Sequence, residues 1–179
     1  MRVLAFIGAL AIVAAIFAVV VFFGGYYNVA ASKKNPAVVD WALKYIREAS
    51  IAKHADATPP SSLDDVALVQ AGARAFQQRG CTNCHGAPGV DWAKFSEGIE
   101  PGPPDLAKDV VPYLRPAELF WVVKNGINMT GMPSFGAIGV DDQEIWSIVA
   151  FLRKLPIVSE TDYKTWTSAP AAPPAGGNP

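Results

Sequence analysis

The only two cysteines of the chain stand in one short segment, Cys81-Thr82-Asn83-Cys84-His85. The spacing Cys-x-x-Cys-His is the attachment motif of c-type haem. Two thiols three positions apart on a helical turn can both reach the vinyl groups of one porphyrin. The adjacent imidazole then projects toward the iron from the same side. The segment therefore predicts one haem c, attached through Cys81 and Cys84, with His85 as an iron ligand.

Two other uses of a Cys-x-x-Cys pair fit the surrounding sequence less well. A redox-active dithiol of the thioredoxin kind needs alternating strands and helices around it, and that pattern is missing. A structural zinc site usually has four protein ligands. Beyond His85, only the distant His54 could add a nitrogen, and we expect that histidine to be exposed at a helix end.

A haem iron that transfers electrons without rearranging needs a second axial ligand, and the thioether of methionine is a common one. The segment 125–135 contains Met129 and Met132. We predict Met132, because Pro133 stiffens the backbone beside it and Gly131 permits a close approach to the porphyrin. Met129 is interpreted as packing at the haem edge. A gap-filling core methionine is the alternative role for Met132.

The elements around these residues predict an all-α domain of a few short helices and long loops. A helix is expected from about Ser62 or Asp65 to Arg79-Gly80, directly before the cysteines. Glycine and proline recur over 86–112 and predict an extended loop. Further helices are expected over 116–125 and 141–154, and no strand or internal repeat is convincing.

The amino-terminal segment is an uninterrupted apolar run from Val3 to Phe23. At about 1.5 Å per residue it spans roughly 30 Å, the thickness of a bilayer's hydrocarbon core. We therefore assign residues 1–31 to a transmembrane anchor. The alternative is a signal peptide cleaved near Val29-Ala30-Ala31, although its apolar core would be unusually long. Either outcome exports the rest of the chain.

Three further regions follow the anchor. Residues 32–61 contain an expected helix from Asn35 to His54 and a proline-containing spacer. That helix has one apolar stripe (Val38, Ala42, Tyr45, Ile46 and Ala49). It is interpreted as lying on the membrane or a partner subunit, or as packing on its own domain. The domain proper is assigned to 62–156, and 157–179 to an extension whose tail after Ser168 is expected to be disordered.

Composition argues against two kinds of main partner. The formal net charge is -1 and no long run of like charges occurs, so neither nucleic acid nor lipid bound through a polybasic patch is the expected main partner. Apolar residues make up 51% of the chain, but many of them lie in the amino-terminal run. The remaining sequence has the composition of an ordinary soluble domain.

Residues 64–156 resemble the class I cytochrome c family, particularly the bacterial single-haem domains related to the cytochrome subunits of cbb3-type oxidases. The resemblance rests on the Cys-x-x-Cys-His motif and on Gly131-Met132-Pro133, which looks like the distal-ligand segment. It also rests on two pairs of residues. Gly72 and Phe76 look like the glycine and aromatic of the family's first helix, and Ile148 and Phe151 look like the pair in its last helix that meets them.

The segment 102–106 is similar to the family's Gly-Pro-x-Leu loop, whose proline carbonyl accepts a hydrogen bond from the haem histidine. We assign this role to Pro103, although the resemblance does not separate it from Pro104. The resemblance implies an electron carrier rather than an enzyme. In the family, haem is attached on the outer side of the bacterial membrane, so the anchored chain is expected to have its haem domain on the periplasmic side of a bacterial inner membrane.

The expected partners are a respiratory donor complex or dehydrogenase and a terminal oxidase or reductase. The chain could also be a fixed subunit of a membrane complex. The alternative function is a haem enzyme or a sensor of gas or peroxide, in which the distal iron position is open.

Overall fold

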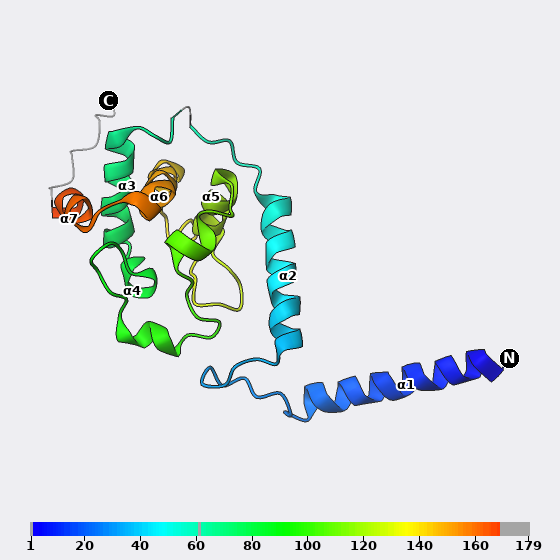
Figure 1. The fold of residues 1–179 in the computed structure, drawn as a ribbon. Helices are drawn as coiled ribbons and strands as arrows, with labels where there is room; N and C mark the ends of the chain where they lie inside the picture. The colour runs from blue at the N-terminus through cyan, green and yellow to red at the C-terminus, as the bar shows by residue number, and fades with distance from the viewer. Residues whose placement is uncertain (1, 61, 169–179) are drawn as a thin grey trace. The chain divides into compact units, whose positions relative to one another are not determined.

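The computed structural model of the chain describes residues 2–60 and 62–168. It divides into two compact units, with the boundary after Lys34. Within the described residues the regular elements are all helical, apart from one isolated bridge between Ala87 and Val90 (Figure 1). The predicted all-α fold is confirmed.

The first unit contains α1 (Arg2–Phe23), which coincides with the predicted apolar run. None of its residues is buried within the unit, and the mean hydropathy of its best window is 3.0. By length and composition α1 can cross a membrane.

The frame of the second unit is a helix crossing between α3 (Val66–Gln78) and α6 (Asp142–Lys154). The crossing is close because Gly72 has no side chain. A Cβ at this position would lie 1.8 Å from the carbonyl oxygen of Ser147. Beside it, the rings of Phe76 and Phe151 pack with their centroids 5.4 Å apart. The predicted meeting of these helices is confirmed, and their packing forms the core of the domain.

A third helix, α5 (Pro116–Asn125), has the predicted bounds and packs on α6. The rings of Phe120 and Trp146 stack across this contact at 4.2 Å. The helix ends at Gly126, which has a φ of 68°. This glycine turns the chain into the loop that contains Met132.

Helix α2 (Ala37–His54) packs on α5, but not through the predicted stripe. Its one buried residue is Ile51, and the ring of exposed His54 stacks on Trp121 at 6.2 Å. Val38, Tyr45 and Ile46 are more than 60% exposed. The helix therefore packs on its own domain with one face and exposes the apolar stripe on another.

The chain continues as ordered structure past the predicted end of the domain at residue 156. After a short turn, η3 (Leu155–Ile157), helix α7 (Glu160–Ser168) packs on α3. Tyr163 is 1% exposed with its ring 5.7 Å from that of Phe151, and Arg74 donates a hydrogen bond to the carbonyl of Trp166. The described part of the predicted extension thus belongs to the domain. The tail expected to be disordered after Ser168 lies outside the described residues.

Candidate haem-binding site

The two cysteines lie on the predicted helical turn, which follows α3 directly and contains the short helix α4 (Thr82–His85). The amide of Cys81 donates to the carbonyl of Phe76 at 3.1 Å, which connects the turn to the core. The amides of Cys84 and His85 both donate to the carbonyl of Cys81. Both cysteines are free thiols on one rigid turn, as covalent attachment to a single porphyrin requires.

The imidazole of His85 is oriented by a hydrogen bond between its Nδ1 and the carbonyl of Pro104, 3.0 Å away. This corrects the assignment of the supporting carbonyl to Pro103. Two consecutive prolines offered two carbonyls, and only the path of the backbone distinguishes them. Since a carbonyl accepts only from a protonated nitrogen, Nδ1 carries the hydrogen and Nε2 has a free lone pair. That is the tautomer in which Nε2 can bind a metal.

The Pro104 carbonyl is itself held by a helix cap that the sequence analysis missed. Asp105 precedes η2 (Leu106–Val110), a single π-helical turn, and accepts hydrogen bonds from the amides of Ala107 and Lys108. Its other oxygen pairs with the Lys108 ammonium at 2.8 Å. This pair lowers the pKa of Asp105, so the cap remains ionised at neutral pH. An aspartate directly after two prolines, ahead of an apolar residue, is the pattern that indicates such a cap.

A pocket of about 540 Å³ opens beside the turn. Its walls include Cys84, His85, Pro103, Pro104 and Ile99. The volume falls within the range of roughly 300–1,000 Å³ that is usual for cofactor sites. Burial lowers the pKa of His85, although the Pro104 carbonyl opposes this shift. The imidazole is therefore neutral at physiological pH, which a metal ligand must be.

The loop after Gly126 holds Met132 through its backbone. The Met132 amide donates to the hydroxyl of Thr130, and its carbonyl accepts from the Ile127 amide. A Cβ on Gly126 would lie 2.6 Å from the carbonyl carbon of Pro133, so the loop can fold back only over a glycine. Met132 is half-buried and packs against the core.

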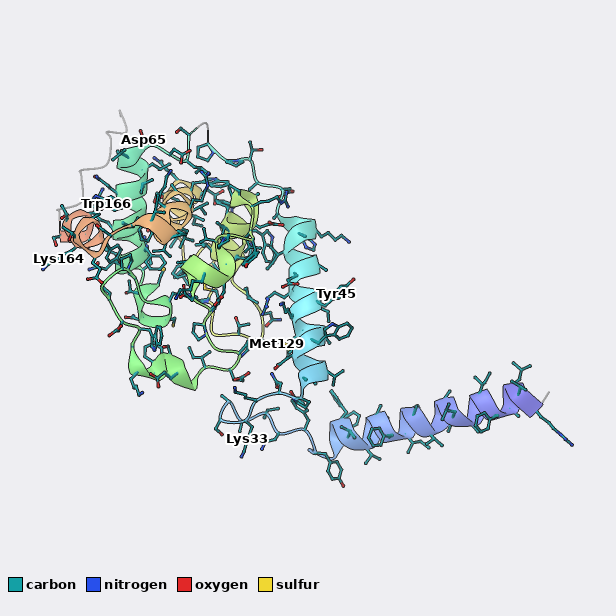
Figure 2. All side chains as sticks on the ribbon, in the orientation of Figure 1. Lys33, Tyr45, Asp65, Met129, Lys164 and Trp166 are labelled. Atoms are coloured by element: carbon teal, nitrogen blue, oxygen red, sulfur yellow. The ribbon has the colours of Figure 1, made fainter. Side chains whose placement is uncertain are left out.

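Met129, in contrast, is 74% exposed and lies on the domain surface (Figure 2). Its φ of 59° is in the left-handed region. The expected packing of Met129 at the haem edge stays a prediction. Of the two methionines, Met132 has the surroundings of a ligand, and its assignment to the iron remains a prediction.

The structure brings three of the five predicted site residues together in the pocket wall and leaves Cys81 and Met132 outside it. Cys84, His85 and Pro103 all line the pocket. Ile99, on the same wall, packs against the Met132 loop, because a Cβ on Gly131 would lie 2.9 Å from its Cγ2. The loop therefore adjoins the pocket at Ile99, a residue that the sequence analysis did not single out.

One buried hydroxyl of the domain, that of Tyr163, lies outside the pocket lining. The phenol oxygen of Tyr163 has no hydrogen-bond partner among the described residues. Burial, and secondarily the nearby Cys81 sulfur, raise its pKa to about 12. A buried donor without an acceptor costs about 1–3 kcal/mol. The two thiols on one turn and the free Nε2 of His85 fit a covalently bound haem.

Comparison with protein families agrees with this geometry. Residues 67–152 match the family model for subunit III of cbb3-type cytochrome c oxidase. This segment is a c-type cytochrome domain. The matched segment contains both cysteines, His85, Pro104 and Met132, whereas α1, α2 and α7 lie outside the match. No curated protein and no solved structure matched the chain.

Proposed function

We propose that this protein is a membrane-anchored cytochrome with a single haem c that transfers one electron at a time between membrane-associated redox partners. The observation that carries the proposal is the orientation of His85. Its Nδ1 is engaged by Pro104, so its Nε2 is free beside two thiols on the same turn. A bound haem would supply the one-electron chemistry, between the ferrous and ferric states of its iron.

The residues of the chain have separate tasks in this proposal. Cys81 and Cys84 would attach the porphyrin, and His85 and Met132 would bind its iron. The Pro104 carbonyl fixes the imidazole and makes it a stronger electron donor to the metal, which favours the ferric state. The thioether of Met132, as an iron ligand, would favour the ferrous state and raise the reduction potential.

Electrons would enter and leave near the half-buried residues Ala87 and Pro88, which line the pocket next to the attachment turn. A tight turn presents them, closed by paired hydrogen bonds between Ala87 and Val90 at 2.9 Å. Gly89 at its tip lies against Glu160 of α7, so the turn is supported from behind. A rigid edge of this kind suits brief contacts with redox proteins.

The donor is a quinol-oxidising complex or a dehydrogenase, and the acceptor a terminal oxidase or reductase. The protein would act on the periplasmic face of a bacterial inner membrane, held by α1 and as a subunit of a membrane complex. The length and hydropathy of α1 support the anchor. Carbonate washing of membranes tests it. A retained anchor leaves the protein in the pellet, and a cleaved one releases it.

The alternative function, an enzyme or sensor with an open iron position, predicts a different response to carbon monoxide. The proposed electron carrier should not bind carbon monoxide in its native ferrous form, because Met132 occupies the distal position. The Met132→Ala variant should bind it readily. Immediate binding by the native protein would favour the alternative.

A further inference from the structure

Helix α2 exposes a set of apolar side chains that its own domain does not use. Val38, Trp41, Tyr45 and Ile46 are each between 63% and 67% exposed. The rings of Trp41 and Tyr45 stack at 6.1 Å, which forms one flat aromatic surface. Figure 2 shows Tyr45 pointing away from the domain, whereas the Ile51 face of the helix lies on α5.

These side chains fall on one narrow strip of the helix. At about 100° per residue, Val38, Trp41, Tyr45, Ala49 and Ala52 lie within roughly 80° of arc, and Ile46 widens it on one side. Charged side chains border the strip. Lys44 and Glu48 form an exposed ion pair of 3.9 Å on one flank, and Lys53 lies on the other. The strip is a second apolar face, separate from the one that packs on α5.

We propose that this second face binds the lipid surface, with Trp41 and Tyr45 at the boundary between headgroups and acyl chains. The inference rests on the anchor in the proposed function. Residues 24–36, between α1 and α2, span at most about 45 Å when fully extended. A bilayer crossed by α1 is therefore always within reach of α2, at a high effective concentration that no soluble partner has.

The chemistry of the face fits this lipid surface better than a protein core. Tryptophan and tyrosine have an apolar ring with a polar edge, and they are enriched at membrane interfaces for that reason. The exposed lysines at positions 33, 34 and 53 could contact lipid phosphates. A face bound in this way would hold the cytochrome domain against the bilayer in one orientation instead of on a free tether.

The experiment measures the depth of two neighbouring positions in the full-length holoprotein. Tyr45→Cys and Lys44→Cys are each spin-labelled, since haem attachment consumes Cys81 and Cys84. The proteins are reconstituted into vesicles of phosphatidylcholine and phosphatidylglycerol. A water-soluble nickel chelate is present on both sides. Power saturation of the electron paramagnetic resonance signal then measures how readily each reagent collides with the spin label. It compares oxygen, which concentrates in lipid, with the chelate, which stays in water.

The ratio of oxygen access to nickel access should be several-fold higher at position 45 than at position 44, which lies about 100° around the helix. Equal nickel access at both positions overturns the proposal. Spin-spin broadening at position 45 also overturns it, because a second copy of the chain would then cover the face.

Two controls separate this proposal from the proposed function. The visible haem spectrum of each sample reports the cytochrome domain independently of the label. Flotation of the vesicles reports the anchor. Protein that floats with the vesicles but has label 45 in water overturns the lipid contact alone. Protein that does not float overturns both the lipid contact and the anchor.

Discussion

The two sides of the candidate haem site are built by different means. On the proximal side, the ligand side chain itself is held, because the ring of His85 is hydrogen-bonded to Pro104. On the distal side, only the backbone is held. The amide and carbonyl of Met132 are engaged by Thr130 and Ile127, and its thioether has only packing contacts. The structure thus fixes the orientation of the His85 ring. For Met132 it fixes the position of the backbone but not the orientation of the side chain that carries the sulfur.

This difference separates the effects of changes on the two sides. Damage to the proximal side should remove the cofactor, since covalent attachment and iron binding share one turn. Damage to the distal side should leave haem attached and change only its second axial ligand. The following variants test this division, from the largest effect to the smallest.

Replacing both cysteines, Cys81→Ala with Cys84→Ala, should abolish covalent haem attachment. Both thioether bonds are then impossible, and His85 alone would hold the group only reversibly. Haem-stained denaturing gels measure the attachment. The matched control is Asn83→Ala, because Asn83 is exposed on the same turn. A stained band in the double variant would contradict the assignment of both cysteines.

Replacing the distal ligand, Met132→Ala, should leave haem covalently bound but remove the weak near-infrared band of methionine-ligated ferric haem. The reduction potential should fall by on the order of 0.1–0.3 V, a part of the roughly 0.8 V that axial ligands control. Potentiometric titration measures it. Met129→Ala should leave both properties unchanged, because Met129 is exposed. The opposite pattern would assign the iron to Met129.

Adding a methyl group at the base of the distal loop, Gly126→Ala, should displace the segment 132–134. The new Cβ would meet the Pro133 backbone at 2.6 Å, at a position where φ is already 68°. We expect a loss of about 1–3 kcal/mol in the free energy of unfolding and a weaker methionine band.

Gly139→Ala is the control for Gly126→Ala, because Gly139 has a φ of 87° but open space around it. It shares the backbone strain without the collision. Chemical denaturation and the near-infrared spectrum are recorded for both variants. Equal losses of methionine ligation in the two would show that the collision does not control the loop.

The smallest effect is expected for Asp105→Ala, which removes the cap behind the Pro104 carbonyl. The unfolding free energy should fall by about 0.5–2 kcal/mol. The reduction potential should rise by tens of millivolts, since a looser carbonyl makes His85 a weaker donor to ferric iron. Asp65→Ala, at the cap of α3, should cost similar stability without moving the potential. An unchanged potential in Asp105→Ala would show that the cap does not act through His85.

Local patterns were sufficient to predict the parts of the fold that short-range chemistry determines. The bounds of α5 follow from Pro116 and Gly126, which are a strong start and stop. The crossing at Gly72 could be predicted because two helices can approach this closely only where one of them has no side chain. The motif at Cys81 predicted its own helical turn, because the three functional groups can converge only there.

Other features depend on tertiary contacts that no local pattern contains. The choice of Pro104 over Pro103 depends on how the loop meets His85. Helix α7 was missed because only Tyr163 and Trp166 connect it to the core, too few for an apolar period. The single apolar stripe assigned to α2 was incomplete, because it left out Ile51, the one residue of α2 that is buried. Arg47 and Ser50, which are polar in sequence, are partly buried as well.

The central claim is that His85 and Met132 bind one covalently attached haem from opposite sides. Visible and near-infrared spectra of the purified native protein, reduced and oxidised, test it most directly. The account predicts a covalent haem with sharp reduced bands and the methionine band in the oxidised form. A covalent haem without that band in the native protein would contradict the distal assignment and favour an open iron site.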